Sequence, residues 1–127
     1  MTQTTRFLGR AIAAMAIFAI IGAYAGAARA TTFAAWQVHG VAFGDTLNVR
    51  KFPSSGSQKQ AAYPNKTILQ MTGPCTAGIN LLDIGSWPKR DQAQVVRHRW
   101  CQVWHDPARN GVFVTGWVYG RYIQPAE

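Results

Sequence analysis

Cys75 and Cys101 are the side chains with the most distinctive chemistry in the chain, which contains no other cysteine. An even cysteine count in a small domain predicts a disulfide wherever the compartment is oxidising. Closing a loop of about 26 residues stabilises a fold by roughly 3–4 kcal/mol in the chain-entropy description. A zinc site would need two more ligands, and no histidine lies at a ligand spacing from either cysteine. We therefore expect a Cys75–Cys101 disulfide, and neither a metal site nor a thiol nucleophile.

The acidic side chains do not form a catalytic pattern. No D-x-D, E-x-x-H or G-x-S-x-G motif occurs in the sequence. Asp106 follows His105, but it also precedes Pro107 and is better explained as the residue that initiates a turn. All the carboxylates lie in or near predicted turns, namely Asp45, Asp83, Asp91, Asp106 and Glu127. We expect no enzymatic activity, no cofactor and no bound metal.

Tryptophan is abundant, with five residues in the chain. In a strand, a period of two places Cys101 and Val103 on one face and Trp100, Gln102 and Trp104 on the other. Burial of an indole side chain is favourable, because each carries about 150–250 Å² of mainly apolar surface. Either the preceding segment folds over them through Leu81, Leu82 or Trp87, or they form an aromatic ledge for a peptide or glycan. The candidate ligand-binding residues are Trp87, Trp100, Trp104 and Tyr119.

Residues 1–30 have the three parts of a secretory signal. Arg6 and Arg10 make the start basic, residues 11–28 carry no charge, and Ala28-Arg29-Ala30 supplies small residues for a signal peptidase. We predict cleavage between Ala30 and Thr31. The alternative is an uncleaved anchor, since the charge-free stretch is near the shortest that spans a bilayer. Either way the following domain, residues 31–127, is expected to be periplasmic or secreted.

The chain is basic, with a formal net charge of +8. Three of its 13 basic residues precede residue 31, which leaves the mature chain at about +5. The remaining basic residues are scattered, and export removes the protein from the usual nucleic acids, so no nucleic-acid partner is expected. The expected partner is a cell-wall polymer or a peptide of an envelope protein, with a membrane involved only if the signal is retained.

The mature chain alternates short β-prone runs with Gly and Pro breaks. Asn110-Gly111 predicts a hairpin, because both residues tolerate positive φ. No run after the signal has an apolar stripe of helical period. We therefore expect an all-β domain of about five short strands in a compact barrel or sandwich. The runs that read as strands are 36–43, 46–52, 66–71, 95–105, 112–114 and 116–119.

Three motifs in order resemble those of bacterial SH3-like domains. Residues 47–50 (LNVR), followed by Pro53-Ser54, are similar to the LNVRxGPS signature that opens such domains. Residues 100–103 (WCQV) stand at the position of a W-x-x-V strand, and residues 116–123 (GWVYGRYI) resemble a GWVxxRYL ending. The resemblance covers about residues 36–125. Phe52 departs from the usual Gly, and residues 76–94 exceed the usual connection.

The resemblance implies a small SH3-like barrel with one inserted loop. It also implies an exported binding module that recognises a cell-envelope ligand, either a peptidoglycan peptide or a segment of a partner protein. The alternative is a structural or accessory component of an envelope protein assembly, with no wall ligand.

The motif residues themselves suggest mainly structural roles. Leu47 and Val49 share one strand face and are expected in the core, while Arg50 is expected to position the next loop by bonding carbonyls. Gly116 and Gly120 are expected to serve backbone geometry, and Trp117 to plug the core. These expectations place ligand contacts on the aromatic residues rather than on the LNVR motif.

Overall fold

The computed structural model describes residues 33–127, so the predicted signal and its cleavage between Ala30 and Thr31 lie outside the described residues. Seven antiparallel strands form one sheet, which confirms a mostly β fold but with seven strands rather than about five. The strands are β1 (Ala34–Val38), β2 (Leu47–Arg50), β3 (Lys59–Tyr63), β4 (Ile68–Cys75), β5 (Trp100–His105), β6 (Val114–Tyr119) and β7 (Ile123–Pro125). The helical segments are η1 (Thr76–Gly78), α2 (Lys89–Val96) and η2 (Gly120–Tyr122). Within residues 33–127, no helix has the length and apolarity needed to cross a membrane.

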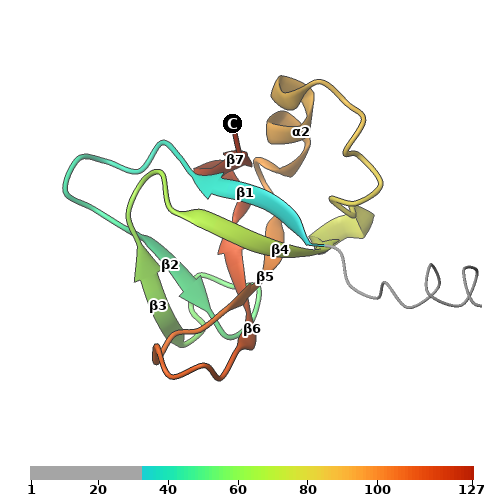
Figure 1. Cartoon of the computed structure of the whole chain (residues 1–127). Coiled ribbons are helices and arrows are strands. Elements are labelled where there is room, and N and C mark those ends of the chain that lie inside the picture. Colours follow the sequence, from blue (N-terminus) through green and yellow to red (C-terminus); the bar gives the residue numbers. More distant parts are fainter. Residues whose placement is uncertain (1–32) are drawn as a thin grey trace, which may run out of the picture. The chain divides into compact units, whose positions relative to one another are not determined.

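The strand order in the sheet is β3-β2-β6-β5-β4-β1-β7. Figure 1 shows the β2–β3 hairpin at one end of the domain and α2 beside β7 at the other. The predicted hairpin joins β5 to β6, whose register runs from Trp100↔Tyr119 to His105↔Val114. Asp106 initiates its turn as predicted, because its carboxylate accepts the backbone N–H groups of Asn110 and Gly111 at 3.2 and 2.8 Å.

The core is built from alternate residues of the strands. Leu47 and Val49 are buried, which confirms their predicted place. Trp117 is not a core plug, because Gly116 and Val118 take the inward positions of β6 and leave Trp117 half-buried on the outer face. The fully buried hydrophobic side chains include Met71, Leu81, Ile123, Val38, Val49, Val96, Val103 and Val118.

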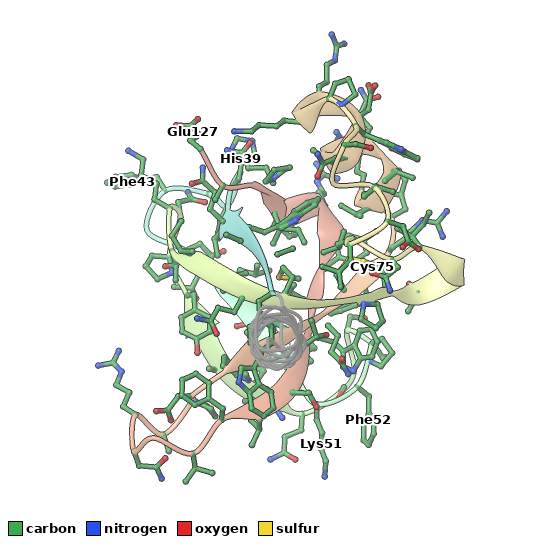
Figure 2. All side chains as sticks on the ribbon, turned by 45° about the vertical axis from the view of Figure 1, so that its right-hand side comes forward. His39, Phe43, Lys51, Phe52, Cys75 and Glu127 are labelled. Atoms are coloured by element: carbon green, nitrogen blue, oxygen red, sulfur yellow. A yellow bond between two sulfur atoms is a disulfide. The ribbon has the colours of Figure 1, made fainter. Side chains whose placement is uncertain are left out.

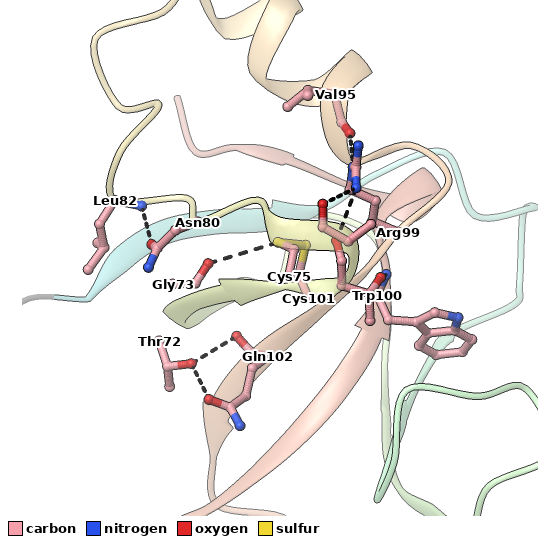
Figure 3. Close-up of a disulfide and its surroundings, with 12 residues drawn as sticks. Thr72, Gly73, Cys75, Asn80, Leu82, Val95, Arg99, Trp100, Cys101 and Gln102 are labelled. Atoms are coloured by element: carbon pink, nitrogen blue, oxygen red, sulfur yellow. Dashed lines mark hydrogen bonds between the residues drawn. A yellow bond between two sulfur atoms is a disulfide. The ribbon is translucent and has the colours of Figure 1, made fainter.

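The predicted disulfide joins Cys75 and Cys101, and both residues are buried. They lie directly opposite each other on β4 and β5, with Cα atoms 4.0 Å apart. Residues 76–99 leave the sheet and return to it at this point, so the bond closes the base of the inserted segment (Figure 3).

Residues 89–96 form a helix where the sequence predicted no helix and a strand from 95. Only Gln92 and Val96 of α2 are buried, so the helix has too narrow an apolar face to show a stripe in the sequence. The Gln92 amide donates to the carbonyls of Trp87 and Gly85 at 2.7 and 3.4 Å, which ties the helix to its preceding loop. Leu82, one of the residues expected as possible cover for the indoles, is 46% exposed.

A buried histidine joins β3 to β5. His105 Nε2 lies 2.9 Å from Gln60 Oε1, and His105 Nδ1 lies 2.9 Å from the Tyr63 hydroxyl. An amide oxygen only accepts hydrogen bonds, so Nε2 carries the proton and Nδ1 accepts from Tyr63. Burial lowers the pKa of His105 and outweighs the opposing effect of Asp106. The lowered pKa favours the neutral form of the ring. The pKa of Tyr63 is raised, by burial first and then by Asp106, against the opposing effect of Arg109.

Gly116 faces this network with no room for a side chain. A Cβ placed there would collide with Gln60 Oε1 and Val49 Cγ1 and would lie 3.1 Å from His105 Nε2. We expect Gly116→Ala to lower the free energy of unfolding in urea by about 1–3 kcal/mol, the usual cost of overpacking. Gly56→Ala is the matched control, because the nearest atom to its Cβ is 3.9 Å away. Equal unfolding midpoints for the two variants would contradict this packing.

The lowered pKa of His105 predicts a pH-dependent stability. The unfolded chain takes up a proton near the ordinary pKa of 6.5, and the folded chain takes it up only at lower pH. The free energy of unfolding should therefore be constant above about pH 6.5 and fall as the pH decreases toward 5, before carboxylates titrate. A His39→Asn/His98→Asn variant keeps only His105 and should show the same fall in denaturant titrations. A flat profile from pH 7.5 to 5 in that variant would exclude this role of His105.

Candidate ligand-binding groove

A groove of about 700 Å³ lies between the β1–β2 loop and the ends of β5 and β6. Its volume is within the range of about 300–1,000 Å³ typical of small-molecule sites. We call it the aromatic groove, and it is lined by Gly40, Val41, Ala42, Asp45, Thr46, Leu47, Asn48, Arg50, Ser55, Trp100, Tyr119, Arg121 and Tyr122. Residues far apart in the sequence therefore meet at one concave surface.

Three aromatic rings form one wall of the aromatic groove. Trp100 and Tyr119 are direct partners across β5 and β6, with ring centroids 5.3 Å apart. Tyr122 follows three residues after Tyr119 through η2, so its ring comes back beside Tyr119 at 6.3 Å. The amide of Trp100 donates to Thr76 Oγ1 at 3.0 Å, next to the disulfide (Figure 3). The wall thus begins at the most constrained point of the sheet.

The opposite wall is the loop of residues 39–46. Asn65, in the turn between β3 and β4, holds this loop with two hydrogen bonds: it accepts the Val41 N–H at 3.1 Å and donates to the Val41 carbonyl at 2.8 Å. The loop turns at Gly44, whose φ of +77° favours glycine. Phe43, at its tip, is fully exposed and extends away from the domain (Figure 2).

The charges in the aromatic groove are mostly positive. Arg50 Nη1 donates to the Ser57 carbonyl at 2.8 Å, so Arg50 positions the following loop as predicted. The Arg121 guanidinium lies 5.9 Å from the centre of the Tyr122 ring, within the range of a cation–π contact. Asp45 is the one carboxylate in the lining. The arrangement is suited to stacking a sugar or peptide group while hydrogen-bonding to its polar edge.

The structure brings together two of the four predicted ligand residues. Trp100 and Tyr119 line the aromatic groove, whereas Trp104 stacks on Phe113 with ring centroids 5.8 Å apart and Trp87 is 43% exposed in the loop before α2. Of the three residues expected as possible cover for the indoles, Leu81 is buried in the core, and Leu82 and Trp87 are exposed. Trp100 and Trp104 pack against Tyr119 and Phe113, respectively.

Tyr122, Arg121 and the whole loop wall were not predicted from the sequence. Tyr122 was detectable in principle, since it stands three residues after Tyr119 beyond a Gly. No sequence signal links the loop to Asn65, 24 positions after Val41. Among residues 33–127, no group of three His, Cys, Asp or Glu side chains is placed to hold a metal ion.

Comparison of the chain with protein-family models, curated proteins and solved structures gives no significant match.

The hydrogen bonds from Asn65 make the loop wall testable. We expect Asn65→Ala to speed amide hydrogen exchange at Val41 by about tenfold or more, since both of its side-chain bonds to the loop are lost. Thr67→Val is the control, because it removes a hydroxyl that bonds only within the same turn, to the Pro64 carbonyl. Similar exchange at Val41 in both variants would show that Asn65 does not hold the loop.

Proposed function

We propose that residues 31–127 form a bacterial SH3-like domain that acts as an exported binding module. Its ligand is an extended cell-envelope molecule, either a peptide of peptidoglycan or a segment of a partner protein, and it binds in the aromatic groove. The observation that carries this proposal is the wall of Trp100, Tyr119 and Tyr122 beside an open space of about 700 Å³.

The places of the three motifs support the SH3-like assignment. LNVR is β2, WCQV begins β5, and GWVYGRYI supplies β6, η2 and the start of β7. Strands β2, β6 and β5 are consecutive in the sheet, so most residues that carry the resemblance build one continuous part of the fold, and only the last of them reaches β7 at the sheet edge. Residues 76–99 are an addition between β4 and β5, closed by the disulfide.

The composition of the aromatic groove supports a binding role. Aromatic rings supply large contact areas at a low cost in side-chain entropy, and their polar edges give orientation. Arg121 and Arg50 add positive charge beside the rings, which favours a ligand carrying carboxylates. Stem peptides of cell walls and acidic protein segments both have this chemistry.

Co-sedimentation with purified sacculi tests the proposal. Wild-type protein should sediment at low salt, and Trp100→Ala or Tyr122→Ala should reduce the bound fraction at least about tenfold, as expected for loss of a buried aromatic contact. Trp87→Ala is the control, because Trp87 is exposed but lies outside the groove. If wild type stays in the supernatant, titration with acidic peptides tests the protein-segment version. Absence of groove-dependent binding in both assays would refute the proposal.

A second candidate function is a role in an envelope protein assembly, and one surface favours it. Trp104 and Phe113 stack on the outside of the sheet, with Val112 beside them 62% exposed and Phe113 42% exposed. Exposed apolar groups gathered in this way are typical of protein contacts. In this case crosslinking in cells from a position near Phe113 should capture one dominant protein, and sacculi should capture nothing.

A further inference from the structure

A second hollow, of about 500 Å³, lies between α2 and the β7 end of the sheet. We call it the basic hollow, and it is lined by His39, Gly40, Arg90, Ala93, Gln94, Arg97, Arg121, Ile123 and Gln124. Three of these residues are arginines and none is acidic. The fold therefore brings three of the scattered basic residues of the sequence to one place.

The helix α2 and its C-cap residue, Arg97, supply two of the arginines on one side. Arg90 and Arg97 are seven positions apart, about two helical turns, and Gln94 stands between them on the same face. Gln92 and Val96 are buried on the other side of the helix. The arginine face of α2 is therefore turned outward, toward the hollow.

Close packing at Gly120 brings the third arginine to the same place. A Cβ on Gly120 would collide with the Val96 carbonyl, and the Gly120 N–H donates to the Arg99 carbonyl at 2.7 Å. Arg121 follows directly, next to the end of α2 where Arg97 stands. No residue larger than glycine would allow this approach of two backbones.

The arginines of the hollow differ from their neighbour Arg99. Arg99 donates to the carbonyls of Val95, Thr76 and Ala77 at 2.9–3.1 Å and so has a structural role (Figure 3). Within residues 33–127, the guanidinium groups of Arg90, Arg97 and Arg121 make no such hydrogen bond, and all three side chains are exposed. Their donors and charges are therefore available to an anion that enters the hollow.

Two acidic residues lie close to the basic hollow without lining it, Asp91, which follows Arg90 in α2, and Glu127. Glu127 lines an adjoining hollow together with His39 and Lys66, and Figure 2 shows Glu127 and His39 at the same corner of the domain. The carboxylates of Glu127 and Asp91 lower the positive potential at the edges of the hollow, whereas its lining holds three arginines and no acid.

We infer that the basic hollow is a binding site for a phosphate group, held by Arg90, Arg97 and Arg121. A phosphomonoester carries nearly two negative charges and three acceptor oxygens, and the planar guanidinium fork matches such oxygens in pairs. Three forks around one hollow therefore favour a phosphate over a carboxylate, which has one charge and two oxygens. The site is separate from the aromatic groove, although both include Gly40 and Arg121.

Titration with pyrophosphate, followed by NMR of the arginine Nε–H and backbone signals at constant ionic strength, tests this site. Pyrophosphate should shift the signals of the three arginines and bind more tightly than acetate. Arg90→Gln and Arg97→Gln should each weaken its binding by about tenfold, as expected for loss of a charge-assisted hydrogen bond. Lys59→Gln, which removes one charge from β3 at the other end of the strand order, should change the affinity less than twofold.

Two further experiments identify the kind of molecule that carries the phosphate group and distinguish the basic hollow from the aromatic groove. Sedimentation with phosphatidic acid vesicles, competed by pyrophosphate, would assign the phosphate to a lipid headgroup, and pyrophosphate binding without vesicle binding would assign it to a soluble or polymer-borne group. Trp100→Ala, which alters only the aromatic groove, should retain pyrophosphate binding. Equal shifts with acetate and pyrophosphate, or unchanged pyrophosphate affinity in Arg97→Gln, would overturn the inference.

Discussion

Cys75 and Cys101 join β4 to β5 at the point where residues 76–99 leave the sheet and return to it. Both candidate sites depend on this bond. Trp100, which begins the aromatic wall of the groove, follows Cys101 directly, and its amide is held by Thr76, which follows Cys75. The helix α2 lies inside the closed segment, so the bond also limits where Arg90 and Arg97 can be. A short polar helix of this kind has little stability of its own.

Alternate residues of β5 point to opposite faces of the sheet, so the residues that stabilise the fold are separate from those that form the exposed aromatic surfaces. Cys101, Val103 and His105 face inward and are buried, and they supply the disulfide, the core and the link to β3. Trp100 and Trp104 face outward near the two ends of the strand; Trp100 packs against Tyr119 with tilted rings, and Trp104 stacks on Phe113. One strand thus positions both exposed aromatic surfaces of the domain, and a change to its inward face alters both.

The sequence predicted those parts of the fold that depend on local patterns. The faces of β5, the turn at Asp106, the buried Leu47 and Val49 and the Cys75–Cys101 pair all follow from period, turn chemistry or composition. The strand β3 (KQAAY) was missed because its residues have weak β propensity. Its place is set by pairing with β2 and by the hydrogen bonds that Gln60 accepts from His105 and that Tyr63 donates to His105. The helix α2 was missed because it buries so few side chains. Half of the groove was missed because its loop wall depends on Asn65, a contact between distant parts of the chain.

The packing around Gly120 lowers the free-energy cost of binding an anion in the basic hollow. Its contact with Val96 and its hydrogen bond to Arg99 fix two backbone segments against each other, so Arg97 and Arg121 start from anchored positions. An anion that binds between them has only side-chain torsions to order, and no loop or helix must be arranged at the moment of binding. The cost of immobilising one long side chain is about 0.5–1.5 kcal/mol, much less than that of ordering a flexible segment. The site is preorganised by the smallest residue near it.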